Sequence, residues 1–100
     1  MIIISGTVSL DASKADAFHV ALEALVTATR AEEGNVSYGF YVDPLEAGTY
    51  RIFEEWADQA ALDAHMGADH MAAFMGQMGD FGVTGIELHS YQASNKTKFM

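Results

Sequence analysis

The chain has 100 residues, of which 14 are Asp or Glu and only 5 are Lys or Arg, so its formal net charge is −9. Because binding to a phosphate backbone needs clustered cations, we expect no binding to nucleic acid or to anionic membrane surfaces. The absence of cysteine excludes disulfides, a thiolate nucleophile and zinc–thiolate sites. A chain of this length fits one domain, so we expect residues 1–100 to carry any binding or catalytic function on a single scaffold.

The first predicted element is a strand over residues 2–9, which are mostly apolar and β-branched. This segment has no basic residues and its apolar run is too short for a signal peptide or a membrane span, so we expect a cytoplasmic protein. An amphipathic helix is predicted over residues 12–33, where apolar residues recur at helical intervals. Asp11 or Ser13 can cap its start, and Gly34 is expected to end it.

Two aromatic-rich segments, residues 35–43 and 49–56, are separated by the turn sequence DPLEAG and predict an antiparallel hairpin. Side chains alternate between the two faces of a strand, so Glu54 stands in the same row as Ile52 and Trp56. A single carboxylate is therefore expected in an otherwise apolar row.

A helix broken in the middle is predicted next. Asp58 can cap a first segment with the sequence QAALDAHM, Gly67 interrupts it, and Asp69 can cap a second short segment. The alternation of residues near 82–92 predicts a last strand. The polar residues 94–100 are expected to form a mobile tail or an arm onto a partner chain.

These elements follow the order β-α-β-β-α-β, which predicts the α+β, ferredoxin-like fold: a four-stranded antiparallel sheet with both helices on one face. The other face has no helix to cover it. Large apolar side chains are expected on both faces of the hairpin: Tyr38, Phe40, Ile52 and Trp56 on one, and Tyr41 and Phe53 on the other. Because monomers seldom expose an apolar patch of this kind, we expect two sheets to associate in a homodimer.

Two histidines, His65 and His70, are the main candidates for chemistry. Five residues turn a straight helix by about 500°, which leaves the two side chains roughly 140° apart, so we expect no shared metal ion unless the break at Gly67 brings them together. His65 lies on the apolar stripe that should face the sheet, where a contact with Glu54 is possible. Such a pair is either a buried polar contact that fixes the helix or a tuned pair that moves a proton. His70 is expected at the rim of a pocket.

No other motif indicates a known catalytic class. The serines lack the G-x-S-x-G pattern, and the 9 glycines form neither G-x-G-x-x-G nor a phosphate-binding loop. What remains is a pocket walled by aromatic and methionine side chains, which suits a small, flat, apolar molecule.

The sequence EEGNVSYGFYVDP, followed by YRIFEEWADQAALDAHMGADHMAAF, resembles the antibiotic biosynthesis monooxygenase (ABM) family. The most specific part is E-x-W followed by A-L-x-A-H and, after a short gap, H-x-x-x-[FY]. Its central matches are Glu54, Trp56, His65, His70 and Phe74. The likeness is greatest for the short quinol-monooxygenase-like members, and it implies a dimeric α+β barrel built from ferredoxin-like subunits.

The resemblance implies a monooxygenase that oxidises a small aromatic, quinol- or anthrone-like substrate with molecular oxygen and without metal, flavin or other cofactor. In such chemistry the electron-rich anion of the substrate reacts with oxygen, so the protein supplies a dry pocket and a base. His65 and Glu54 are then expected to handle the proton. The expected substrate-binding residues are Trp56, Tyr41, Phe53, His70 and Phe74.

Departures from the family pattern leave other functions open. Ile52 and Leu62 stand where actinorhodin-type members have an Asn and a Tyr linked to substrate binding. His65 and Met75 replace the Trp and the axial His of haem-degrading relatives, which disfavours haem breakdown. The alternatives are a dimeric binding or regulatory protein for a small apolar metabolite, and an isomerase that acts on an aldehyde or a signal molecule.

Overall fold

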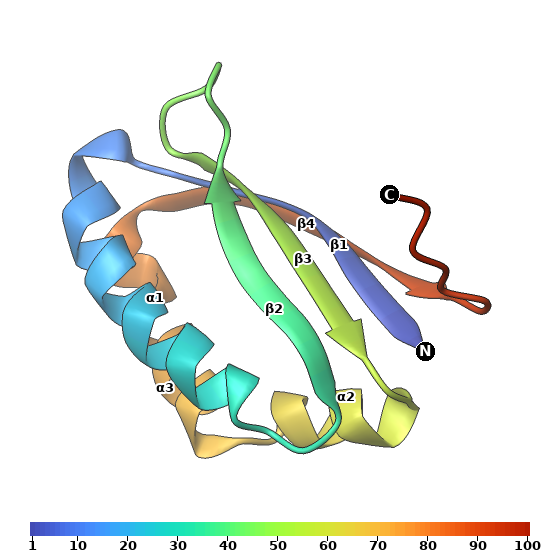
Figure 1. Cartoon of the computed structure of the whole chain (residues 1–100). Coiled ribbons are helices and arrows are strands. Elements are labelled where there is room, and N and C mark those ends of the chain that lie inside the picture. Colours follow the sequence, from blue (N-terminus) through green and yellow to red (C-terminus); the bar gives the residue numbers. More distant parts are fainter.

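The computed structural model describes residues 1–100 and contains one four-stranded antiparallel sheet with helices against one of its faces (Figure 1). The strand order is β2-β3-β1-β4, so β2 and β4 are the edges. The elements in chain order are β1 (Ile2–Leu10), the 3-10 turn η1 (Ala12–Lys14), α1 (Ala15–Arg30), β2 (Asn35–Val42), β3 (Thr49–Trp56), α2 (Gln59–Met66), α3 (Asp69–Gly76), the 3-10 turn η2 (Met78–Phe81) and β4 (Val83–Gln92). None of the helices has the length and apolar character that crossing a bilayer requires.

The first helix is shorter than the predicted 12–33. Asp11 accepts hydrogen bonds from the backbone N–H and the hydroxyl of Ser13 and so begins η1. Helix α1 then runs only to Arg30, and an irregular turn precedes Gly34, whose φ of 85° directs the chain into β2. The helix therefore ends four residues before the glycine, and the turn between them is free to take part in a site.

The predicted break in the second helix is confirmed. Asp58 caps α2 by accepting a 2.9 Å hydrogen bond from the Ala61 N–H, and α2 ends at Met66 with Gly67 as its C-cap. The prediction that Asp69 caps α3 is wrong, because the N-cap is Ala68, which has extended backbone and no side-chain hydrogen bond. Two helices of eight residues each thus meet at a sharp change of direction.

The core lies between the sheet and the helices. Phe18 of α1 and Trp56 of β3 are fully buried, and Glu54 is only 6% exposed. The predicted row with one carboxylate among apolar side chains is therefore confirmed. Apolar core residues that share this layer are Ile2, Val8, Leu10, Phe18, Leu22, Leu25, Tyr38, Tyr50, Ile52, Trp56, Leu62, Phe74 and Phe81.

Edge strand β4 has little cover over its inner face. Residues opposite one another in an antiparallel pair point to the same face, so Ile86 and Leu88, opposite Val8 and Gly6, point to the helix side. They are nevertheless 52% and 40% exposed. A cavity beneath β4 is consequently open on one side.

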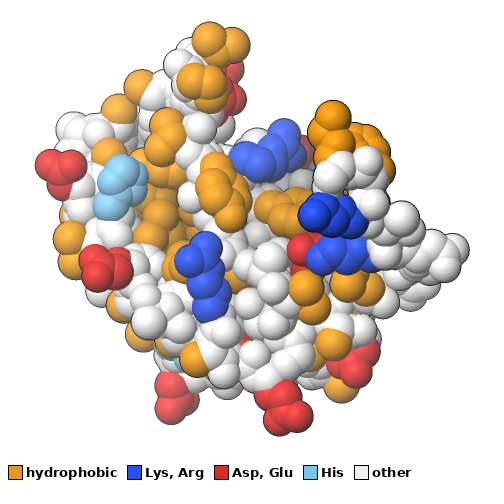
Figure 2. Space-filling model, viewed as in Figure 1, with side chains coloured by type: hydrophobic (Ala, Val, Ile, Leu, Met, Phe, Trp, Pro, Cys, Tyr) orange, Lys and Arg blue, Asp and Glu red, His pale blue; other side chains and the backbone are white.

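The outer face of the sheet carries no helix. Tyr41 and Tyr91 are 54% and 53% exposed, and Figure 2 shows apolar side chains distributed over the visible surface near β2 and β3. After β4 the chain turns back toward this face, where Lys96 Nζ lies 3.3 Å from Glu55 Oε2. The C-terminal residues therefore lie beside the sheet rather than pointing away from it (Figure 1).

Candidate functional site

His65 is held between α2 and the sheet. The Asp58 cap starts α2 so that Leu62 and His65 are its buried residues. The imidazole lies against Trp56, with ring centroids 4.7 Å apart, and meets the edge of Tyr38 at 5.3 Å. Because His65 is only 1% exposed and has aromatic rings on two sides, its orientation is fixed by packing.

Glu32, which the sequence did not single out, is the hydrogen-bond partner of His65. Its Oε2 lies 2.8 Å from His65 Nδ1. Glu32 belongs to the turn after α1, and this turn is tied to the start of α2 because Gly34 O accepts a hydrogen bond from Ala57 N–H at 2.8 Å. A Cβ at Gly34 would lie 2.6 Å from the Ala61 Cβ, so this close approach requires glycine. The turn thereby brings Glu32 to the imidazole.

The possible contact between His65 and Glu54 does not take the form of a hydrogen bond. Glu54 Oε1 instead accepts a 3.0 Å hydrogen bond from Trp56 Nε1 on the same strand face. The Glu32 carboxylate occupies the Nδ1 side of the His65 imidazole. Nothing in the sequence indicated that Glu32 would be this partner. His65 and Glu54 are still neighbours, because both line one cavity.

His70 lies closer to His65 than the straight-helix argument predicted. The change of direction between α2 and α3 brings the two rings to a centroid separation of 6.0 Å. His70 Nε2 lies 3.1 Å from Glu32 Oε1. The two atoms are not aligned for a hydrogen bond, and this buried nitrogen has no other partner. The expectation that the two side chains point apart is therefore wrong: one carboxylate faces both imidazoles.

A cavity of about 290 Å³ lies beneath β4. Its lining residues are Ile4, Glu54, Leu62, His65, Met66, Met71, Leu88, His89 and Ser90. A smaller cavity of about 40 Å³ shares Glu54, Met71 and Leu88 with it and extends toward Tyr38 and Phe74. The larger cavity is near the lower end of the range of roughly 300–1,000 Å³ that small-molecule sites occupy. Three ionisable side chains, Glu54, His65 and His89, in a mostly apolar wall make it the candidate site.

Burial sets the ionisation of the groups around this cavity. It lowers the pKa of His65, and the hydrogen bond and charge of Glu32 only partly oppose that shift. Burial raises the pKa of Glu54 against the opposing hydrogen bond from Trp56, and burial with the charges of Glu54 and Glu32 raises the pKa of Tyr38. The neutral forms of all three groups are therefore favoured.

We expect Glu54→Gln to increase the free energy of unfolding at neutral pH by about 1–3 kcal/mol, because the amide cannot ionise and its oxygen can still accept a hydrogen bond from Trp56. The folded-state pKa of Glu54 is raised above the ordinary 4.5, so its ionisation destabilises the fold as pH rises through the folded-state pKa. The difference between variant and wild type should vanish below about pH 4.5. Urea unfolding on both sides of this pH measures it; a difference independent of pH would contradict the assignment.

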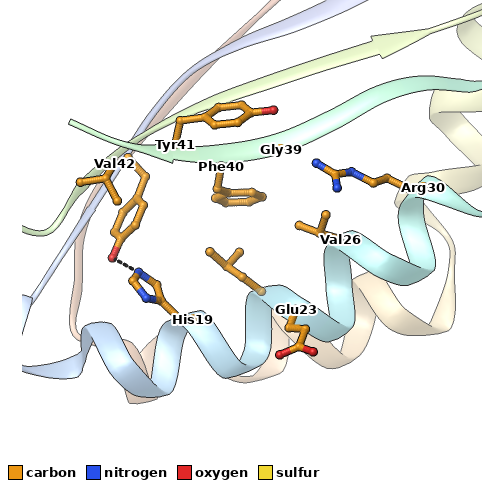
Figure 3. Close-up of a pocket in the computed structure, with 10 residues that line it drawn as sticks. His19, Glu23, Val26, Arg30, Gly39, Phe40, Tyr41 and Val42 are labelled. Carbon is orange, nitrogen blue, oxygen red and sulfur yellow. Dashed lines mark hydrogen bonds between the residues drawn. The ribbon is translucent and has the colours of Figure 1, made fainter. Parts of the chain in front are cut away.

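Tyr41 and Phe53 lie outside the cavity. Strand alternation places Phe53 on the sheet face opposite Glu54, and Tyr41 lies on the side of β2 away from α1 (Figure 3). Tyr41 borders a separate groove of about 340 Å³ between α1 and β2, in which His19 Nε2 lies 2.7 Å from the Tyr50 hydroxyl. Trp56 and Phe74 do belong to the inner site: the first holds His65 and Glu54, and the second lines the smaller cavity.

Comparison with known proteins places this arrangement in a family. A family model described as antibiotic biosynthesis monooxygenase matches residues 1–77, which include Glu32, Glu54, His65 and His70. The chain belongs to the antibiotic biosynthesis monooxygenase family. Only the cavity wall contributed by β4 lies beyond the matched residues.

Two of the similar proteins carry names that agree with this assignment. The "Putative monooxygenase YcnE" of Bacillus subtilis is 31% identical over 75 residues, which are 75% of this chain and 79% of YcnE. An uncharacterized Synechocystis protein, sll1783, is 28% identical over 91% of this chain, but the match spans only 62% of that longer protein. A crystal structure described as a putative ABM from Deinococcus radiodurans has a TM-score of 0.91 at 26% identity and covers 100% of this chain and 99% of its own. The ferredoxin-like fold is thus confirmed as that of ABM proteins.

Two residues of the site, Glu32 and Tyr38, were missed by sequence reasoning. Glu32 follows the last helical turn, where a charged residue normally faces solvent, and nothing in its spacing from His65 indicates a contact. The position of Tyr38 could have been predicted, because it stands in the same strand row as Phe40, which shares a face with Ile52 and Trp56.

Proposed function

We propose that this ABM chain is an oxygenase that binds a small aromatic, quinol- or anthrone-like molecule in the cavity beneath β4 and oxidises it with molecular oxygen, without a cofactor. The observation that carries the proposal is the buried His65–Glu32 pair, with Nδ1 and Oε2 2.8 Å apart, at the wall of a largely apolar cavity. Membership of the ABM family and the names of its relatives support monooxygenase chemistry in general.

The hydrogen bond to Glu32 selects one form of His65. A carboxylate accepts, so Nδ1 carries the proton, and in the neutral imidazole Nε2 is left with a free lone pair. That lone pair can take a proton from an acidic O–H or C–H group of a bound aromatic molecule. Glu32 then stabilises the imidazolium that forms, as a positioning residue that does not touch the substrate.

The reaction balances without another reductant. For an anthrone-like CH₂ group, removal of a proton gives an electron-rich anion that reacts with O₂. The CH₂ carbon becomes C=O, one oxygen atom enters the product, and the other leaves as water with the two hydrogens. His65 returns its proton to the departing oxygen. Burial raises the pKa of Glu54, and in its protonated form this carboxyl can donate a hydrogen bond to the substrate oxygen.

Oxygen uptake by the unmodified protein with a panel of reduced quinols and anthrones tests this proposal. We expect saturable uptake with at least one member and one oxygen atom in the product. Binding of panel members, detected by quenching of Trp56 fluorescence, without any oxygen uptake would instead favour a binding or regulatory protein. The assay thereby separates the two function classes.

We also propose that the chain works as a homodimer. Support comes from apolar side chains exposed on both uncovered surfaces, including Tyr41 and Tyr91 on the outer face and Ile86 on the open side of β4. A second chain would bury them and help exclude water from the cavity. Sedimentation at micromolar concentration should give twice the 10.8 kDa mass of the chain; a monomer throughout that range would contradict this part of the proposal.

A further inference from the structure

Three side chains converge from three separate segments near the end of α1. Glu32 comes from the turn after α1, His65 from α2 and His70 from α3, and one ligand atom of each lies within 4.8 Å of the others. Two of the separations, 2.8 Å from His65 Nδ1 and 3.1 Å from His70 Nε2, are to the two oxygens of the Glu32 carboxylate. Neighbouring ligands on one ion with bonds of about 2.0–2.1 Å lie roughly 3 Å apart, so little rearrangement is needed.

We propose that Glu32, His65 and His70 form a binding site for one divalent transition-metal ion. The buried His70 Nε2 supports this, because it faces the carboxylate without a hydrogen bond of its own and an ion would satisfy it. Glu32 has no Lys or Arg partner; its ion pairs are with the two histidines alone. Its negative charge is therefore available to a cation.

The surroundings favour a fixed geometry. His65 is oriented by Trp56 and Tyr38, and the turn that carries Glu32 is tied to the start of α2 by the hydrogen bond from Ala57 N–H to Gly34 O. His70 is 26% exposed, which gives an ion a route from solvent and leaves room for water in the remaining coordination positions. Ligands held in place before the ion arrives lose little conformational freedom on binding.

The donor set determines the class of ion. Two imidazole nitrogens and one carboxylate oxygen suit Zn²⁺, Cu²⁺, Ni²⁺, Co²⁺ or Fe²⁺, whereas Ca²⁺ and Mg²⁺ prefer sites made of oxygen ligands. No cysteine is present to select a softer ion. Among first-row ions, Cu²⁺ and Zn²⁺ are expected to bind more tightly than Co²⁺ or Fe²⁺.

Metal binding would control the proposed oxygenation. An ion on His65 Nδ1 displaces the proton that Glu32 now accepts, and in the neutral ring the remaining proton then lies on Nε2. Nε2 can no longer accept a proton from the substrate, so Zn²⁺ is expected to inhibit oxygen uptake and a chelator to restore it. This consequence rests on the proposed function, whereas the metal site itself does not.

Titration of the untagged, chelator-treated protein with Co²⁺, followed by its visible absorption, tests the site. We expect one equivalent per chain with a tetrahedral or five-coordinate spectrum, and loss of that spectrum when Zn²⁺ is added. His70→Ala and Glu32→Gln should each weaken binding by about 100-fold or more. His19→Ala and His89→Ala are matched controls that remove the other two histidines and should bind as the wild type does.

The test does not depend on a variant that fails to fold. His70 is partly exposed, so circular dichroism should give His70→Ala a melting curve close to that of the wild type. In the unmodified protein, bound Co²⁺ should also shift the NMR signals of His65 and His70 and leave those of His19 in place. Absence of binding at millimolar Co²⁺, or binding that survives His70→Ala, would overturn the metal site. Neither result bears on oxygen uptake by the metal-free protein.

Discussion

His65→Ala is expected to lower kcat for oxidation of the best quinol or anthrone by roughly 10²–10⁴-fold, the usual contribution of a positioned general base. The substitution removes the lone pair that accepts the proton, while the apolar wall that binds the ring system stays in place. KM should therefore change little compared with kcat. Steady-state oxygen uptake over a range of substrate concentrations separates the two parameters.

Two further variants identify the role of the imidazole. Glu32→Gln keeps the size of the side chain, but its amide can donate a hydrogen bond to His65 Nδ1, which would place the imidazole proton on Nε2. This variant should also lower kcat, although residue 32 does not contact the substrate. His19→Gln, in the separate groove between α1 and β2, is the control and should retain wild-type uptake. Uptake that survives His65→Ala would remove His65 from the reaction.

Phe18→Ala should destabilise the fold by about 3–5 kcal/mol, a large part of the roughly 5–15 kcal/mol that stabilises an ordinary domain. The Phe18 side chain is completely buried and stands at the centre of the aromatic layer between α1, the sheet and α3. Its ring lies 5.0–6.1 Å, centroid to centroid, from those of Phe40, Tyr50, Phe74 and Phe81. The alanine leaves a cavity that these rigid rings cannot fill.

Val20→Ala is the matched comparison on the same helix. Val20 is 73% exposed, so its truncation should change the free energy of unfolding by less than about 0.5 kcal/mol. Urea unfolding followed by circular dichroism measures both variants at one pH. Equal and small effects would mean that the aromatic layer around Phe18 is not the principal core.

Local patterns in the sequence predicted most of the fold. Alternation in residues 49–56 placed Glu54 and Trp56 on one face, and the sheet has that register because a shift by one residue would expose the whole row. The end of α1 was not predictable in the same way, because residues 31–33 continue the helical composition. The packing of the following turn on α2, which requires Gly34, ends the helix earlier.

The site depends on tertiary geometry that periodicity does not contain. On a straight helix the side chains of His65 and His70 would point apart. The change in backbone direction at Gly67 and Ala68 brings their rings close together. Glu32 reaches both because its turn packs on α2, where His65 lies beside His70 of α3. Sequence reasoning therefore found the histidine that lines the cavity, but it assigned the wrong carboxylate as its partner.

A crystal structure of the complex with a reduced quinol, prepared without oxygen, would show directly whether the substrate binds beside His65. We predict density for the ligand in the cavity beneath β4, with a hydroxyl within hydrogen-bond distance of His65 Nε2 and Nδ1 still bonded to Glu32. A ligand bound instead in the groove between α1 and β2, beside His19 and Tyr41, with the cavity empty, would contradict the account.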